Sequence, residues 1–192
     1  MSAFSNPVRL MVRPFRVYAE LAVAEGGAGQ PTVALGMARF LFVFGAFVSL
    51  TATGRLAPNE LFSGMISFAY VPIVHGIALG VATRSVARHV RLARAFALYA
   101  EGYGPWFLLM LLVAGGSLFA PSPARLLAAT AGWLGLVALT WSGLLTFACF
   151  RSGLGLSRRR AATATALHHL IIVGLFLGYF LAAGQLLPIL PR

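Results

Sequence analysis

Three histidines fall inside apolar stretches of the sequence, at His75, His168 and His169. Ionisable groups are costly to bury in a membrane, so such residues are candidates for a functional site. Imidazole nitrogens can ligate a haem iron or another metal, and they can carry protons. If His75 faced one of the paired histidines, the chain could be an electron-transfer subunit that associates with haem or a quinone. This is one of the functions that we consider.

The expected depths of these histidines argue against a shared haem. Counted at about 1.5 Å per residue from the inner ends of the apolar stretches, His75 lies about 12 Å deep and His168 about 5 Å deep. His168 and His169 are neighbours and point about 100° apart on a helix. We therefore expect no cofactor and no metal. We expect His75 to bond to a backbone carbonyl that Pro72 deprives of its usual partner.

Five apolar stretches must position these residues. A helix needs about 20 apolar residues to cross a hydrocarbon core of about 30 Å, and 59% of the 192 residues are hydrophobic. The sequence predicts an all-α fold, with a cytoplasmic interfacial segment at residues 1–32 and a five-span membrane domain at residues 33–192. The predicted spans are residues 33–53, 61–83, 103–120, 126–150 and 165–187.

The arginines predict how the chain is oriented. All 15 basic residues are arginines, and they alternate between the connections. Three precede the first span, four follow the second and four follow the fourth, whereas one arginine occupies each of the other three connections or ends. The positive-inside rule then predicts a cytoplasmic amino terminus and an external carboxyl terminus in a cell inner membrane.

These arginines are also the predicted lipid contacts. We expect anionic lipid as the partner of this charge and no nucleic acid, because the charge flanks apolar spans. The predicted contacts are Arg9, Arg13, Arg16, Arg84, Arg88, Arg91, Arg158, Arg159 and Arg160.

Two groups of these arginines show a helical spacing. Arg9, Arg13 and Arg16 share one stripe with Glu20, in a segment that Pro14 should divide into two short helices, the longer one from Pro14 to about Ala24.

The second group, Arg84, Arg88 and Arg91, shares one helical face. The second span is therefore expected to continue as a helix into the headgroups.

Small residues predict where helices pack. Gly76 and Gly80 form a GxxxG step in the second span, and Gly174 and Gly178 form another in the fifth. Such steps let two backbones approach closely in a membrane. Ala78 lies on the face adjacent to the first step, and Ala78→Leu should be tolerated there if lipid is its neighbour. Whether the glycine contacts form within the chain or between subunits is left open by the sequence.

Catalysis is not expected. The chain has no aspartate, which intramembrane aspartyl proteases and metal-dependent lipid phosphotransferases use, and it has no HExxH, phosphate-loop or serine-elbow motif. A small transporter or channel is an alternative, but it needs a polar path that Ser67, Tyr70, Thr140 and Gln185 do not obviously supply. The sequence favours a scaffold, assembly factor or accessory subunit that contacts other membrane proteins or a second copy of itself.

Two short segments resemble a known family. The segment PFRVYAELA precedes the first span, and FALYAEGYGPWFLLMLL enters the third. With five spans, this order of parts resembles the YIP (Ypt-interacting-protein) family, and its bacterial branch more than its eukaryotic one. The residues that carry the resemblance are Pro14, Phe15, Tyr18 and Glu20, then Tyr99, Tyr103, Pro105 and Trp106.

The resemblance has a limited implication for function. For bacterial members it implies membrane organisation without a defined activity. Eukaryotic members are implicated in membrane traffic and in binding prenylated small GTPases, and no residues of this chain match such a site.

The predicted topology is testable with reporter fusions. Because the arginine count alternates through five spans, successive fusions should alternate between the cytoplasm and the outside. Two adjacent fusions that report the same side would contradict the five-span arrangement. Suitable fusion points follow Phe4, Pro58, Arg91, Pro123, Arg158 and Arg192.

Overall fold

The computed structural model describes residues 5–23, 33–119 and 123–186, and every regular element in these ranges is helical. The all-α prediction is confirmed. The described residues form nine α-helices, one 3-10 turn between α6 and α7, and one π turn after α8. They are α1 (Ser5–Val12), α2 (Pro14–Val23), α3 (Val33–Thr53), α4 (Pro58–Ser67), α5 (Tyr70–Val86), α6 (Leu92–Ala100), η1 (Glu101–Tyr103), α7 (Gly104–Phe119), α8 (Pro123–Ala148), η2 (Cys149–Gly153) and α9 (Arg158–Leu186).

Five helical segments are long and apolar enough to cross a membrane, as the sequence predicted. The structure is therefore that of a multi-pass membrane protein. The segments are Gly36–Thr53, Pro58–Val86, Leu92–Gly116, Trp133–Gly153 and Arg158–Tyr179. The third and fifth membrane segments begin well before their predicted starts at residues 103 and 165. Helix α6 adds a helical stretch before η1 in the third segment, and α9, the fifth segment, starts in the arginine run.

Prolines interrupt two of the five segments. Pro72 has no N–H to donate to the carbonyl of Phe68, and the N–H of Val71 donates to that carbonyl instead, at 3.1 Å. The helix breaks there, between α4 and α5. In the third segment, Pro105 follows the tightened turn η1, which separates α6 from α7. Both segments therefore bend inside the membrane domain.

The predicted extension of the second span is wrong. Helix α5 ends at Val86, and Ala87 adopts a non-helical conformation with φ −150° and ψ 64°. Arg84 donates from Nη1 to the carbonyl of Arg88 at 2.9 Å, so its side chain closes the loop and does not extend a basic stripe. Arg88 and Arg91 lie in this connection between α5 and α6, and a single helical face for the three arginines does not form.

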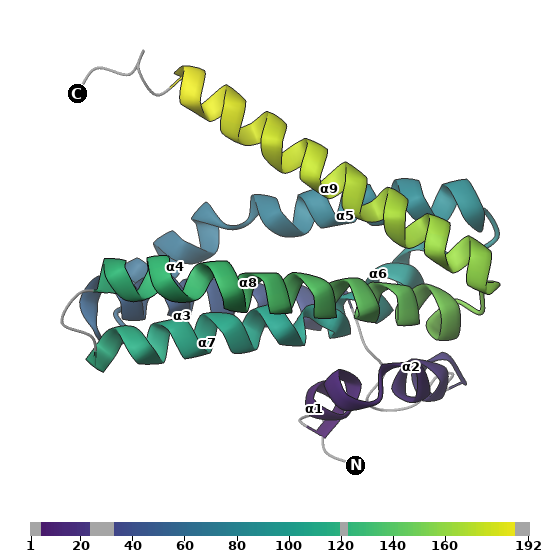
Figure 1. Cartoon of the computed structure of the whole chain (residues 1–192), viewed down its shortest axis with the longest axis horizontal. Coiled ribbons are helices and arrows are strands. Elements are labelled where there is room, and N and C mark those ends of the chain that lie inside the picture. The colour runs from purple at the N-terminus through teal and green to yellow at the C-terminus, as the bar shows by residue number, and fades with distance from the viewer. Residues whose placement is uncertain (1–4, 24–32, 120–122, 187–192) are drawn as a thin grey trace.

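The connections gather at two ends of the molecule (Figure 1). Residues 87–91 and 154–157 lie at one end, and the link from α3 to α4 lies at the other. Helix α3 packs along α4 and α7, α7 packs along α8, and α5 packs along α9. Helix α9 runs obliquely away from the other helices toward its carboxyl end (Figure 1).

The amino-terminal segment forms two short helices, α1 and α2, that meet at Pro14 as predicted. Leu10, Val17 and Tyr18 are at most 2% exposed, since these helices pack on η2, η1, α7 and α8. Burial raises the pKa of the Tyr18 phenol well above its usual range. An interfacial position for this segment stays a prediction.

A carboxylate joins the two amino-terminal helices. Glu20 accepts hydrogen bonds from Arg16 and Arg9, each at 2.9 Å, so the charged stripe predicted from the sequence survives the break at Pro14. The hydrogen bond from Arg16 is the main reason why the pKa of Glu20 lies below its ordinary value. The carboxylate form is therefore favoured at neutral pH.

The closest helix contacts use glycines that the sequence analysis did not select. A Cβ atom added to Gly64 of α4 would lie 2.7 Å from Val48 Cβ and 3.0 Å from Gly45 Cα, and one added to Gly45 would lie 2.5 Å from the carbonyl oxygen of Leu61. Such distances leave no room for a side chain. Helices α3 and α4 are thus held together by glycine contacts near the end opposite to α1 and α2.

The predicted glycine steps behave differently. A Cβ atom on Gly76 would meet the ring of Phe96 at 3.1 Å, but Gly80, Gly174 and Gly178 have nothing within 4 Å among the described residues. Ala78 is fully buried, because its face of α5 lies against α9, so the condition for tolerating Ala78→Leu is not met. Among the described residues, Gly76 is the one predicted glycine of the four that makes a close contact.

Replacing Gly64 by Leu should destabilise the protein. The new side chain would overlap α3, and overpacking of this kind costs about 1 to 3 kcal/mol. Thermal unfolding in mild detergent measures the effect. Gly80→Leu is the matched control, because it adds the same atoms where no described neighbour lies within 4 Å. Equal unfolding temperatures for the two variants would contradict the close α3–α4 contact.

Candidate functional site

Helices α5 and α9 bring two of the candidate histidines together. Their facing sides carry alanines that are fully buried, Ala78 and Ala82 on α5 and Ala161 and Ala164 on α9. Small side chains let two helices approach closely in a membrane. His168 lies one turn after Ala164 on the same face of α9, so the alanine contact directs its ring toward α5.

His75, Tyr99, Tyr103, His168 and His169 form what we call the histidine–tyrosine cluster. His75 Nδ1 and the Tyr99 hydroxyl share a hydrogen bond of 2.7 Å. The His168 ring centre lies 5.7 Å from that of His75 and 4.9 Å from that of Tyr99. Tyr103 lies 5.4 Å from both His75 and Tyr99, with edge-to-face ring geometry. The cluster thus joins α5, α6, η1 and α9.

The expected mismatch in depth between His75 and His168 is wrong. Helix α9 begins at Arg158, seven residues before the predicted start of the span, and α5 ends at Val86. At about 1.5 Å per residue, His75 lies about 16 Å from its helix end and His168 about 15 Å from its own. The apolar stretch marked the hydrophobic part of the fifth helix but not its first turns, which contain arginines.

The expected partner of His75 is also wrong. Its ring bonds to Tyr99 on α6, whereas the Phe68 carbonyl that Pro72 cannot reach accepts the N–H of Val71. His75 therefore links two helical segments and does not repair the break at Pro72.

The paired histidines differ in their surroundings. His168 is fully buried, and neither of its ring nitrogens has a hydrogen-bond partner among the described residues. His169 places Nδ1 2.8 Å from the carbonyl oxygen of Thr165. A carbonyl only accepts, so Nδ1 carries the proton of His169. An imidazole without partners in an apolar bundle is costly, and His168 is therefore the cluster member that packing alone does not explain.

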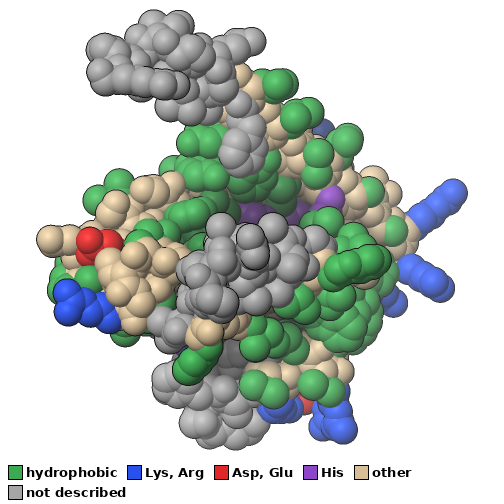
Figure 2. Space-filling model, turned by 60° about the vertical axis from the view of Figure 1, so that its left-hand side comes forward, with side chains coloured by type: hydrophobic (Ala, Val, Ile, Leu, Met, Phe, Trp, Pro, Cys, Tyr) green, Lys and Arg blue, Asp and Glu red, His purple; other side chains and the backbone are tan. Residues whose placement is uncertain are grey.

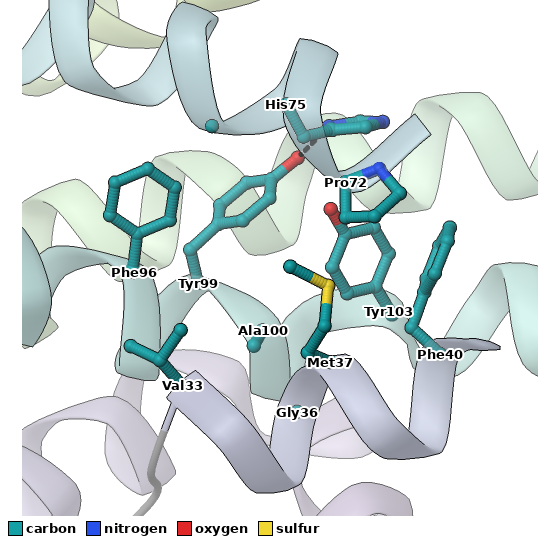
Figure 3. Close-up of a pocket in the computed structure, with 11 residues that line it drawn as sticks. Val33, Gly36, Met37, Phe40, Pro72, His75, Phe96, Tyr99, Ala100 and Tyr103 are labelled. Atoms are coloured by element: carbon teal, nitrogen blue, oxygen red, sulfur yellow. Dashed lines mark hydrogen bonds between the residues drawn. The ribbon is translucent and has the colours of Figure 1, made fainter. Parts of the chain in front are cut away.

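A cavity of about 170 Å³ lies against the cluster, between α3, α5 and α6. Figure 3 shows the His75–Tyr99 hydrogen bond along one edge, with Phe96 and Phe40 on either side of the drawing. Its other lining is mostly aliphatic. The described lining residues are Val33, Gly36, Met37, Phe40, Pro72, His75, Gly76, Phe96, Tyr99, Ala100 and Tyr103.

An ion pair closes the bundle beside this cavity. Arg39 of α3 donates from Nη1 to the Glu101 carboxylate of η1 at 3.3 Å, and the Glu101 side chain is only 8% exposed. Arg39 lies in the first half of α3, and Glu101 follows α6 directly. Their contact neutralises both charges and holds α3 against the turn that precedes α7.

The cluster offers hydrogen bonds more readily than metal ligation. Among the residues that the structure describes, no three His, Cys, Asp or Glu side chains gather as a possible metal site. The rings of His75, Tyr99 and His168 pack against one another. The absence of haem stays a prediction, and it now depends on this packing and on the size of the cavity, since the argument from depth has failed.

The predicted lipid-contact arginines lie around the surface (Figure 2). Arg158, Arg159 and Arg160 are exposed in the first turn of α9, and Arg84 and Arg88 are exposed at the end of α5 and in the loop after it. In Figure 2, arginine side chains project from the edges of the molecule, while histidine side chains lie between hydrophobic ones. These positions permit contact with lipid headgroups but do not test it.

The sequence analysis missed the two tyrosines of the cluster as site residues. Tyr99 and Tyr103 entered it only as marks of a family resemblance. Their spacing of four residues was the available signal, because it places both rings on one helical face. Their pairing with His75 could not be found in this way, because it joins two spans across the connection at residues 87–91.

Comparisons with known proteins do not identify the chain. No protein-family model, no curated protein and no solved structure matches it. The resemblance to the YIP family therefore stays a prediction.

Substituting the two histidines should have opposite effects on stability. His168→Leu removes a buried imidazole that has no described partner, so the free energy of unfolding should rise by about 1 to 2 kcal/mol. His75→Leu leaves the Tyr99 hydroxyl without its 2.7 Å partner and should lower the same quantity by about 1 to 3 kcal/mol. Thermal unfolding in detergent compares them. A destabilised His168→Leu variant would mean that this ring is hydrogen-bonded in the membrane.

Proposed function

We propose that this chain is a non-catalytic membrane protein that acts as a scaffold, assembly factor or accessory subunit. Its partners would be other membrane proteins or a second copy, bound through the membrane-facing surface of α9. The single observation that carries this proposal is the poor coverage of α9 by the other described helices.

One face of helix α9 contacts α5 and α8, with Phe176 and Tyr179 against Tyr70, and another face is left uncovered by the described residues. On the uncovered face Leu170 is 70% exposed, Val173 61% and Leu181 60%. Gly174 and Gly178 meet no described residue within 4 Å. The helix also departs from its neighbours in direction (Figure 1). Lipid tails can cover exposed leucine and valine side chains. The groove left by two glycines on one helix face is instead typical of a surface that packs closely against another helix.

The glycines inside the bundle give a comparison within the same chain. Gly45 and Gly64 each receive a neighbouring helix so closely that a Cβ atom would overlap it. Gly174 and Gly178, with the same spacing as the other predicted step, face an empty surface. The chain thus uses close glycine contacts where its own helices meet. This supports an equivalent contact on α9 with a helix of another molecule.

The charge distribution supports the proposed orientation. The connection before α6 holds Arg88 and Arg91, and the run that starts at Arg158 begins α9, whereas Arg55 occupies the connection between α3 and α4 at the opposite end. With an inner-membrane location, the arginine-rich end would be cytoplasmic and would meet anionic lipid. The resemblance to bacterial YIP proteins agrees with a role in membrane organisation.

A transporter or channel receives less support. Thr140, one of the polar residues that a path would need, is exposed on the outside of α8 and donates to its own helix at the carbonyl of Leu136. Tyr70 stacks on Tyr179 at 4.7 Å between ring centres. Neither residue lines a polar path through the bundle.

The double variant Gly174→Leu/Gly178→Leu tests the proposal. It should reduce recovery of the partner, or of a second tagged copy, at least about fivefold after mild-detergent purification, because added side chains prevent close approach. Unfolding temperature should stay unchanged, since no described residue lies within 4 Å. Gly115→Leu/Gly135→Leu is the control, with the same added atoms at two other open positions. Equal recovery in both variants would overturn the role of α9.

A further inference from the structure

The cavity beside the histidine–tyrosine cluster selects a ligand without charge. None of its described lining residues is an arginine or a carboxylic acid. A phosphate or ammonium group would lose its hydration there without gaining an ionic partner, which is strongly unfavourable. The lining therefore excludes the charged headgroups of common phospholipids and favours a neutral molecule.

The polar edge of the cavity can always donate a hydrogen bond. If Tyr99 donates its hydroxyl proton to His75 Nδ1, the neutral His75 ring carries its own proton on Nε2. If His75 donates from Nδ1, the Tyr99 hydroxyl can donate to a ligand or to the side chains of Thr146 and Tyr103, with which it also bonds. The Tyr103 hydroxyl lies in the same lining, so a donor remains at this edge in each arrangement. This edge suits a ligand with a carbonyl or hydroxyl oxygen.

The shape and walls favour a flat ring. The cavity volume of about 170 Å³ is below the range of roughly 300 Å³ and more that encloses a whole small molecule. Only one end of a ligand can be enclosed. Phe40, Phe96 and the two tyrosines supply aromatic faces for stacking, and Val33 in the lining is 40% exposed, so a tail has a way out of the bundle.

We propose that this cavity binds the ring of a lipid-soluble quinone, with a ring carbonyl at the His75–Tyr99 edge and the tail in the bilayer. The aromatic walls and the donor edge favour a quinone over other neutral lipids, because a quinone presents a flat ring and a carbonyl oxygen to the same site. His168 lies behind this edge, with its ring centre 4.9 Å from that of Tyr99. This proposal does not depend on the uncovered face of α9 that is proposed to bind a partner.

Binding can be measured with tritiated decyl-ubiquinone. The full chain in lipid nanodiscs is compared with empty nanodiscs, so that partition of the probe into lipid is subtracted. Saturable binding near one ring per chain is expected. Gly76→Leu fills the cavity, where Phe96 already lies 3.1 Å from an added Cβ atom, and it should raise the Kd at least about tenfold. The control Gly80→Leu, one turn away on α5 with no described neighbour within 4 Å, should leave the Kd unchanged.

A second variant tests the polar edge with little change in volume. The double change His75→Phe/Tyr99→Phe removes both donors of the His75–Tyr99 pair and should raise the Kd about fivefold to tenfold, the value of one lost hydrogen bond. Dioctanoylglycerol, a neutral lipid with a hydroxyl head, should not displace the probe. No saturable binding, or equal affinity in wild type, Gly76→Leu and Gly80→Leu, would overturn the proposal. Displacement by dioctanoylglycerol would overturn the assignment of a quinone and identify a site for glyceride heads.

Discussion

The close approach of α5 and α9 is the contact on which the centre of this protein depends. Four buried alanines occupy the facing sides of these helices. In a membrane, lipid tails compete equally for apolar side chains, so association depends on the fit between backbones. The alanines provide that fit, and they carry His168 to within 5.7 Å of His75. If α5 and α9 lay farther apart, His75 would still bond to Tyr99, but His168 would no longer contact either ring.

The second constraint is the need to satisfy backbone groups around the prolines. Pro72 and Pro105 each lack the backbone N–H that a helix residue donates. The α-helix is interrupted at both places, by a short-range hydrogen bond from Val71 to Phe68 before Pro72 and by the 3-10 turn η1 before Pro105. These breaks bend the second and third segments beside the cavity, which Pro72, Tyr99 and Tyr103 all line. The cavity thus occurs where two interrupted helices meet α3.

Much of the fold could be predicted from composition, and much less of the site. Apolar stretches of about 20 residues mark spans because the hydrocarbon core has a fixed thickness, and Pro14 divided the amino-terminal segment as expected. The start of α9 was not predicted, because its first residues are arginines. Hydropathy indicates whether a residue prefers water or lipid, and it does not indicate whether the backbone is helical. The His75–Tyr99 bond depends on how two spans rotate against each other, which no local spacing specifies. The contact between Gly45 and Gly64 was not predicted, because neither glycine belongs to a GxxxG step within its own helix.

Helix α1 is synthesised well before the helix against which it finally packs. Trp141 donates from Nε1 to the carbonyl of Met11, and 130 residues separate the two. At roughly 5 to 20 residues per second, the ribosome needs about 7 to 26 s to make the intervening chain. During that interval Leu10, Val17 and Tyr18 lack the surface that finally covers them. The bilayer surface is the nearest apolar environment during that time. The amino-terminal segment would therefore bind lipid first and would pack on the protein after the fourth span has inserted into the membrane.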